Sequence, residues 1–170
     1  MHEMGGHFVS YRSANPWRRS GWFAVAALII VVDQISKIHF NTGYQYGEMR
    51  AVIPGFFSFT LVYNPGAAFN FLGGAGGWQK HLFTGLAFAV SGWLGWNVVR
   101  GRFSLLMNCA ASFIIGGALG NVVDRLLYGH VIDFILLYYH DWFYPAFNLA
   151  DSFICLGAAL MILDSLTNKR

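Results

Sequence analysis

The stretch FSLLMNCAASFIIGGALGNVV, residues 103–123, decides the fold class. At a rise of about 1.5 Å per residue it is long enough to cross a bilayer as one helix, and it carries no charged side chain. Three further blocks, residues 17–40, 81–99 and 147–166, have a similar length and apolar character. The sequence therefore predicts an all-α membrane protein built as a bundle of four transmembrane helices.

The composition agrees with this prediction. Hydrophobic residues make up 56% of the 170-residue chain, charged residues make up 11%, and the mean hydropathy is +0.47. Soluble domains carry about a quarter charged residues, so this chain has far fewer than a water-exposed surface needs. The same composition excludes a disordered chain and a coiled coil. The net charge of +3 comes from scattered Lys and Arg residues, which argues against binding to nucleic acid. One domain, residues 1–170, is expected.

Lysine and arginine residues predict the orientation of the bundle. Four spans place both termini on one side, and the tail, residues 1–16, and the connection between the second and third blocks lie on that side. It carries seven of the basic residues and the other side carries four. The side with seven is predicted to be cytoplasmic. No small-residue pair suited to cleavage follows the first block, so we expect that helix to be retained.

Two outer segments, residues 41–80 and 124–146, connect the spans. Apolar and polar side chains alternate over residues 57–63, which predicts a strand in a small extracytoplasmic β-sheet lying on the membrane surface. Residues 134–139 are apolar and aromatic but too short to span, so we expect a short interfacial helix or flap there. The candidates for a mobile flap that covers a site are Phe134, Tyr138, Tyr139 and Trp142.

Two acids at the outer edge, Asp133 and Asp151, are the candidate catalytic pair. Each is flanked by apolar residues, and the chain between them leaves the outer edge and returns to it. Two close carboxylates in a poorly solvated site cannot both ionise easily, so one keeps its proton. Such a pair can act as general acid and general base on a water and hydrolyse a peptide bond without a metal.

Structural roles are the alternatives for these polar residues. Asp151 is suited to cap the last helix, and Asp133 to pair with Arg125. Asp124 and Arg125 have the positions of an ordinary surface ion pair. Asp33 and Lys37, spaced i, i+4, are assigned first to a structural pair on a helix surface.

The histidines and cysteines lack the spacing of metal ligands, and no nucleotide-binding motif is present, so no metal and no cofactor are expected. A proton or ion pathway is an alternative function, because acids within a membrane often mark such pathways. The polar groups collect at one edge, however, and a pathway needs them at several depths. A scaffold or lipid-binding module is a third alternative, which gives no reason for the paired acids.

Five motifs in order resemble those of the lipoprotein signal peptidases, the type II signal peptidases of bacteria. They cover the chain from about residue 20 to 166: Val32-Asp33-Gln34-Ile35-Ser36-Lys37, Asn64-Pro65-Gly66-Ala67-Ala68-Phe69, Gly116-Gly117-Ala118-Leu119-Gly120-Asn121-Val122-Val123-Asp124-Arg125, Val131-Ile132-Asp133-Phe134 and Phe147-Asn148-Leu149-Ala150-Asp151.

This resemblance implies an aspartic endopeptidase of the bacterial inner membrane. Such an enzyme removes the signal peptide from diacylglyceryl-modified prolipoproteins, before the lipidated cysteine, and works in contact with membrane lipid. The resemblance places the catalytic aspartates at Asp133 and Asp151. It implies substrate binding by Asn64, Asn121, Arg125 and Asn148, with Asp124 in support beside Asp33 and Lys37. We expect the protein to act as a monomer.

Overall fold

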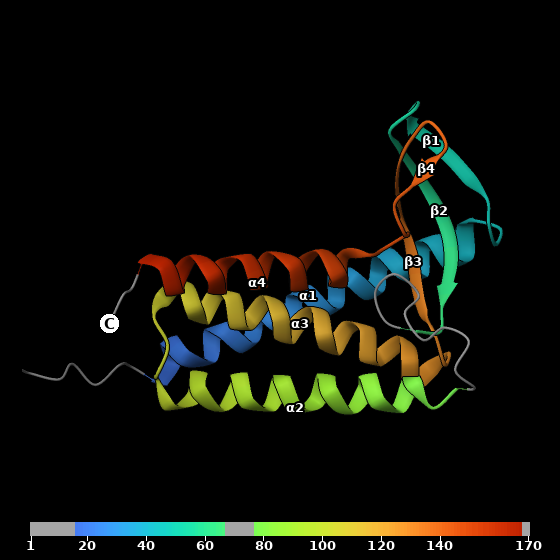
Figure 1. Ribbon diagram of the computed structural model, residues 1–170. Coiled ribbons are helices and arrows are strands. Elements are labelled where there is room, and N and C mark those ends of the chain that lie inside the picture. The colour runs from blue at the N-terminus through green and yellow to red at the C-terminus, as the bar shows by residue number, and fades with distance from the viewer. Residues whose placement is uncertain (1–15, 67–76, 168–170) are drawn as a thin grey trace, which may run out of the picture.

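A computed structural model of the chain describes residues 16–66 and 77–167. The elements follow in the order α1 (Pro16–Gly43), β1 (Met49–Ile53), β2 (Phe57–Asn64), α2 (Gln79–Arg100), α3 (Leu105–Leu127), β3 (Val131–Tyr139), β4 (Trp142–Phe143) and α4 (Leu149–Thr167). The four helices form a bundle, and the strands form a sheet at one end of it (Figure 1). All four helices are long and apolar enough to cross a membrane. The four predicted spans are confirmed, with ends that differ by a few residues.

Helix α3 is the central helix of the bundle. It packs most extensively against the other three helices and has the largest buried share, and α1, α2 and α4 expose large apolar side chains such as Leu28, Leu86 and Ile162. Exposed leucines and isoleucines suit a hydrocarbon environment. Glycines permit the close approach of α3 to α4: a Cβ atom on Gly117 would collide with the main-chain oxygen of Ala150, and Gly157 meets α3 in the same way. This close contact fixes the start of α4 against the C-terminal half of α3.

The sheet is antiparallel, in the order β1-β2-β3-β4. The predicted strand at residues 57–63 is confirmed as β2, which pairs with β3 so that Val62 faces Asp133 and Asn64 faces Val131. The sheet stands at a steep angle to the helix axes and projects beyond the bundle on the side of α4 (Figure 1). This pairing delivers Asn64 and Asp133 to the end of the bundle.

The segment expected as an interfacial helix or flap is built differently. Residues 131–139 form strand β3, because pairing with β2 satisfies the main-chain groups of a segment that is apolar on both faces. Phe134 is buried and stacks on Phe40 with the ring centroids 4.2 Å apart, so it belongs to the core and not to a flap. Tyr139 and Trp142 are exposed at the β3–β4 turn. Movement of that turn stays a prediction.

Candidate active site

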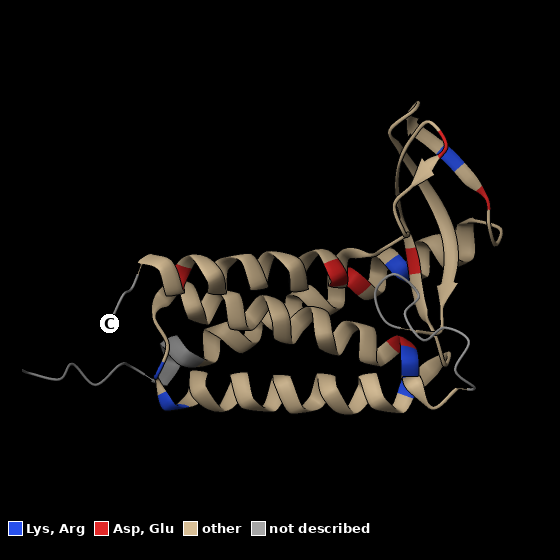
Figure 2. Cartoon of the chain, viewed as in Figure 1, with Lys and Arg blue, Asp and Glu red and all other residues tan. Residues whose placement is uncertain are grey.

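A buried ion cluster joins α1 to α3 at the sheet end of the bundle, where several charged residues gather (Figure 2). The Lys37 ammonium lies 2.8 Å from Asp33 Oδ2, 2.9 Å from Asp124 Oδ2 and 2.8 Å from Asn121 Oδ1. The i, i+4 pair of Asp33 and Lys37 therefore forms, but it is fully buried and not on a helix surface. Asp124 binds this lysine in place of its neighbour Arg125, so the predicted surface ion pair is wrong.

Each acid of the cluster also holds a second element in place. Asp33 Oδ1 accepts a hydrogen bond of 2.9 Å from the main-chain N–H of Ala150, in the first turn of α4. Asp124 Oδ2 accepts one of 3.1 Å from the main-chain N–H of Ile132, at the start of β3. Ala150 precedes Asp151 and Ile132 precedes Asp133 in the chain. The ammonium of Lys37 thus lies between two carboxylates that each anchor the backbone beside one of the paired aspartates.

Asn148 connects the two aspartates directly. Its side-chain nitrogen donates to Asp133 Oδ1 at 2.7 Å, and its side-chain oxygen accepts from the main-chain N–H of Asp151 at 2.9 Å. Its main-chain N–H in turn points to Asp151 Oδ2 at 3.4 Å. Asn148 is completely buried and caps α4 in a reciprocal arrangement with Asp151. The predicted capping role of Asp151 is therefore present. It uses Oδ2, so Oδ1 of Asp151 can face the other polar residues of the site.

Two further asparagines complete the hydrogen bonds of the aspartates. Asn64 from β2 donates to Asp133 Oδ2 at 3.1 Å, and Asn121 from α3 donates to Asp151 Oδ1 at 2.8 Å. Asp133 is 1% exposed. Burial and, to a smaller extent, the negative charge of Asp151 together raise the pKa of Asp133 to about 7. The two aspartates therefore lie on either side of Asn148 in a poorly solvated place, where the raised pKa of Asp133 favours a proton on that residue up to about neutral pH.

Arg125 lies at the margin of this arrangement. Its guanidinium donates to the main-chain oxygen of Gly66 at 3.2 Å and lies over the ring of Phe83. Neither ion pair considered for it, with Asp133 or with Asp124, forms. Its Nε is buried and has no hydrogen-bond partner among the described residues. A buried, unpaired donor beside the paired carboxylates is suited to bind an acceptor on a substrate.

The structure brings eight of the nine predicted site residues into one hydrogen-bonded network, with Arg125 at its edge. Sequence reasoning missed Gln34, whose side-chain nitrogen donates to Asp124 Oδ1 at 2.8 Å and to the main-chain oxygen of Gly120 at 3.1 Å. An amide next to an acid inside an apolar block was the available signal. In the part of the chain that the structure describes, no group of three or more His, Cys, Asp and Glu residues is arranged to hold a metal ion.

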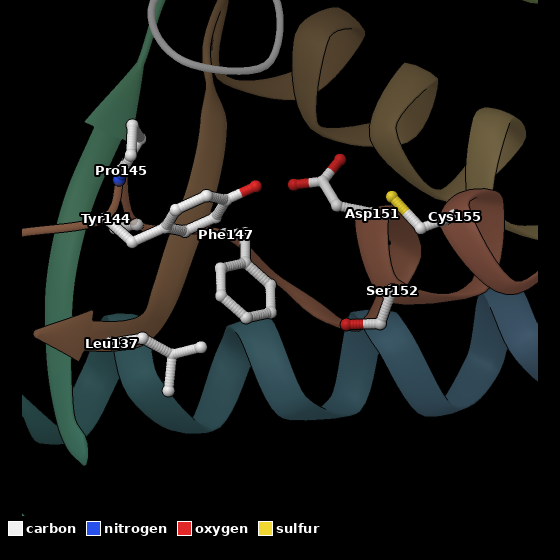
Figure 3. A pocket seen from close by; sticks show the side chains of 8 residues that line it. Leu137, Tyr144, Pro145, Phe147, Asp151, Ser152 and Cys155 are labelled. Atoms are coloured by element: carbon white, nitrogen blue, oxygen red, sulfur yellow. The ribbon is translucent and has the colours of Figure 1, made fainter. Parts of the chain in front are cut away.

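An apolar cavity of about 400 Å³ adjoins the network. It was not predicted, because its walls come from segments that only the fold brings together. The residues that line it are Leu137, Tyr144, Pro145, Ala146, Phe147, Asp151, Ser152 and Cys155 (Figure 3). Among the described residues that line it, Asp151 is the one with a charge, and it belongs to the candidate catalytic pair.

Four apolar helices with two aspartates held together by Asn148 at one end define an integral membrane hydrolase of the aspartic type. Comparison with known proteins gives the family: the chain matches Signal peptidase (SPase) II over residues 25–167 and belongs to that family. It is 75% identical to the lipoprotein signal peptidase of Chromobacterium violaceum over 146 residues, which cover 85% of this chain and 90% of that protein. It is 46% identical to that of Cupriavidus necator over 168 residues, 94% of this chain and 95% of the relative.

Solved structures agree with this family membership. A bacterial membrane enzyme determined by the in meso method at 2.3 Å resolution superposes with a TM-score of 0.77 at 30% sequence identity, covering 89% of this chain and 92% of the other. A second, at 1.9 Å resolution, gives a TM-score of 0.74 at 31% identity, covering 88% and 95%. The resemblance seen in the five sequence motifs and the predicted fold class are confirmed.

Proposed function

We propose that this protein removes signal peptides from diacylglyceryl-modified bacterial prolipoproteins by hydrolysing the peptide bond before the lipidated cysteine. Family membership supports the reaction, and one structural observation carries the assignment of residues. A single buried residue, Asn148, holds both aspartates: its side chain donates to the Asp133 carboxylate and accepts the main-chain N–H of Asp151, and its main-chain N–H points to the Asp151 carboxylate. These two aspartates are the catalytic residues in this proposal.

The proton of the pair belongs on Asp133 in the resting site. Asp133 is the more buried aspartate, with a pKa near 7, on a strand that offers no helix dipole. Asp151 lies in the first turn of α4, where the helix dipole favours a negative charge. Asp151 then takes a proton from a water, which attacks the scissile carbonyl carbon, while Asp133 donates its proton to the carbonyl oxygen. When the intermediate collapses, Asp151 gives its proton to the leaving amine, the C–N bond breaks, and Asp133 regains a proton from a hydroxyl of the intermediate.

The asparagines act mainly by positioning. Asn121 and Asn148 were expected to bind substrate, but both donate their amide hydrogens inside the network, and Asn148 is fully buried. Asn64 has a similar role at Asp133 and also accepts the main-chain N–H of Gly66 at 3.0 Å. Arg125, with its unpaired Nε, remains the residue assigned to bind the substrate main chain. Asp33, Lys37 and Asp124 support the site by anchoring the main chain next to the two aspartates.

The placement in the membrane is part of the proposal. Charge asymmetry in the sequence favours both termini in the cytoplasm and the sheet end at the extracytoplasmic face of the bacterial inner membrane. Elements α1, β2, α3, β3 and α4 of one chain supply every predicted site residue, which supports action as a monomer. Contact with membrane lipid follows from the exposed apolar faces of α1, α2 and α4.

A polar pathway through the bundle has little support in the structure. The asparagines deeper in the spans bind main-chain oxygens nearby: Asn97 donates to Trp93 and Asn108 donates to Phe103. The direct test of the peptidase is cleavage of a lipidated prolipoprotein by the purified chain, with an unlipidated prolipoprotein alongside. Cleavage before the lipidated cysteine is expected, and no cleavage of either substrate would contradict the proposed function.

A further inference from the structure

The cavity beside Asp151 has a composition that restricts what it can hold. Its volume of about 400 Å³ lies in the range of pockets that take small groups. The Ser152 hydroxyl donates its hydrogen to the main-chain oxygen of Asn148 at 3.0 Å, so that hydrogen is not available to a ligand. Both oxygens of Asp151 face donors on Asn121 and Asn148. Apart from the Tyr144 hydroxyl, the rest of the described wall is mainly apolar, so the cavity suits an apolar group held next to a carboxylate.

One wall of the cavity is the Tyr144 ring. The tyrosine follows β4, and its main-chain N–H donates to the oxygen of Leu137 at 2.9 Å. Its ring meets the ring of Phe147 edge to face, with centroids 6.0 Å apart. Phe147 is itself fixed, because its main chain exchanges hydrogen bonds with Ile135. In Figure 3 the phenol of Tyr144 reaches across the cavity toward Asp151. The ring therefore stands as a fixed wall of the cavity, facing Asp151.

We propose that this cavity receives an apolar side chain of the signal peptide close to the scissile bond, and that Tyr144 sets the size of the side chain accepted. The inference rests on the proposed function. If Asp151 activates the water, the bond to be cut lies beside it, and the group in the adjoining cavity belongs to a residue near that bond. Acyl chains of the substrate can instead lie along exposed apolar side chains such as Leu156 and Ile162 of α4.

Substrates that differ in one side chain test this proposal. Lipidated prolipoprotein peptides carry Ala, Leu or Phe at a single position before the cut, and each position is varied in turn. Cys155→Phe fills the cavity from α4, and Leu156→Phe places the same aromatic side chain at an exposed neighbour that does not line it. Tyr144→Ala enlarges the cavity, and Tyr144→Phe keeps its shape. For each enzyme and substrate, kcat/KM is measured.

Size complementarity is the expected result at one substrate position. Cys155→Phe lowers kcat/KM by about 10- to 100-fold for the Leu substrate and much less for the Ala substrate. Tyr144→Ala raises the kcat/KM for the Phe substrate, relative to that for the Leu substrate, by about 10-fold or more. Tyr144→Phe and Leu156→Phe keep the wild-type preference. Cys155→Leu, a smaller insertion, gives an intermediate preference and serves if the phenylalanine variant does not fold.

Three results would overturn the inference. An equal loss of kcat/KM for all substrates in the Cys155 variants would mean that the cavity does not select substrates by side-chain size. Rescue of the Cys155 variants by shorter acyl chains on the substrate, and not by smaller side chains, would assign the cavity to lipid. An unchanged preference in Tyr144→Ala would remove the role of that ring. Failure of the wild-type chain to cleave any lipidated substrate would instead contradict the proposed function, so the two failures are distinguishable.

Discussion

The side-chain amide of Asn148 donates a hydrogen bond of 2.7 Å to Asp133 Oδ1 across the junction between α4 and β3. The same residue caps α4 through Asp151, so the geometry of both aspartates depends on one buried side chain. A strand and a helix that are separate in the fold thereby present their carboxylates at the same place.

Replacing this residue tests how much the site depends on it. Asn148→Ala removes the donor to Asp133 and the cap of α4, so we expect the free energy of unfolding to fall by about 1 kcal/mol or more. Activity is expected to fall by about 10²-fold, because the aspartates lose their relative position. Asn41→Ala, which removes only an acceptor for the Tyr63 hydroxyl, is the matched control. Similar activity in the two variants would argue against a positioning role for Asn148.

The buried ion cluster is expected to dominate local stability. Lys37→Met leaves Asp33 and Asp124 buried without their counter-ion, which costs about 3–5 kcal/mol. Arg50→Met breaks the exposed pair with Glu48, and such pairs contribute at most about 1 kcal/mol. Unfolding in detergent micelles compares the two variants. A loss in Lys37→Met no larger than in Arg50→Met would contradict the assignment of Lys37 as the centre of the cluster.

Gly120 provides space for this cluster. A Cβ atom at this position would lie 2.8 Å from Asp33 Oδ2, so Gly120→Ala is expected to displace the Asp33 carboxylate and weaken its bond to the first turn of α4. Gly85→Ala in α2 is the control, because nothing lies within 4 Å of its added Cβ atom. Thermal unfolding and cleavage rate should both fall in Gly120→Ala, and Gly85→Ala should match or exceed the wild-type stability. Equal behaviour of the two would refute this account.

The pKa of Asp133, raised from 3.8 to about 7, sets the expected pH dependence. If protonated Asp133 donates to the scissile carbonyl, kcat/KM falls as the pH rises through about 7. The folded state binds a proton that the unfolded state has lost, so the free energy of unfolding also decreases between about pH 4 and pH 7 and then levels off. Asp133→Asn should remove this part of the stability profile. An alkaline limb that begins well above pH 8 would contradict the assignment of the proton.

The sequence was sufficient for the architecture. Apolar blocks of membrane-spanning length predict α1 to α4, because the bilayer leaves few alternatives to a helix for a polar backbone. Alternation over residues 57–63 predicts β2. The run 134–139 carries no alternation, since both faces of its strand are covered, and its burial pattern became visible only with the partner strand in place. That is why a strand was taken for an interfacial helix or flap.

The candidate site was partly predictable for a similar reason. Asp133 and Asp151 stand out as acids among apolar neighbours, and charge in such surroundings signals a specific role. The partners of Asp33, Lys37 and Asp124 depend on which helix faces meet, and near-neighbour spacing suggested surface pairs instead. The role of Gln34 and the cavity beside Tyr144 depend on contacts between distant segments, which local patterns do not encode.

Cleavage of a lipidated prolipoprotein by the Asp133→Asn and Asp151→Asn variants tests the central claim most directly. Each change keeps the shape of the side chain and removes its ability to exchange a proton, so we expect kcat to fall by about 10³-fold or more with the fold retained. Asp141→Asn, at an exposed acid in the β3–β4 turn, should cleave like the wild type. Near-normal turnover by either the Asp133 or the Asp151 variant, in a folded and inserted protein, would contradict the assignment of these two aspartates as the catalytic pair.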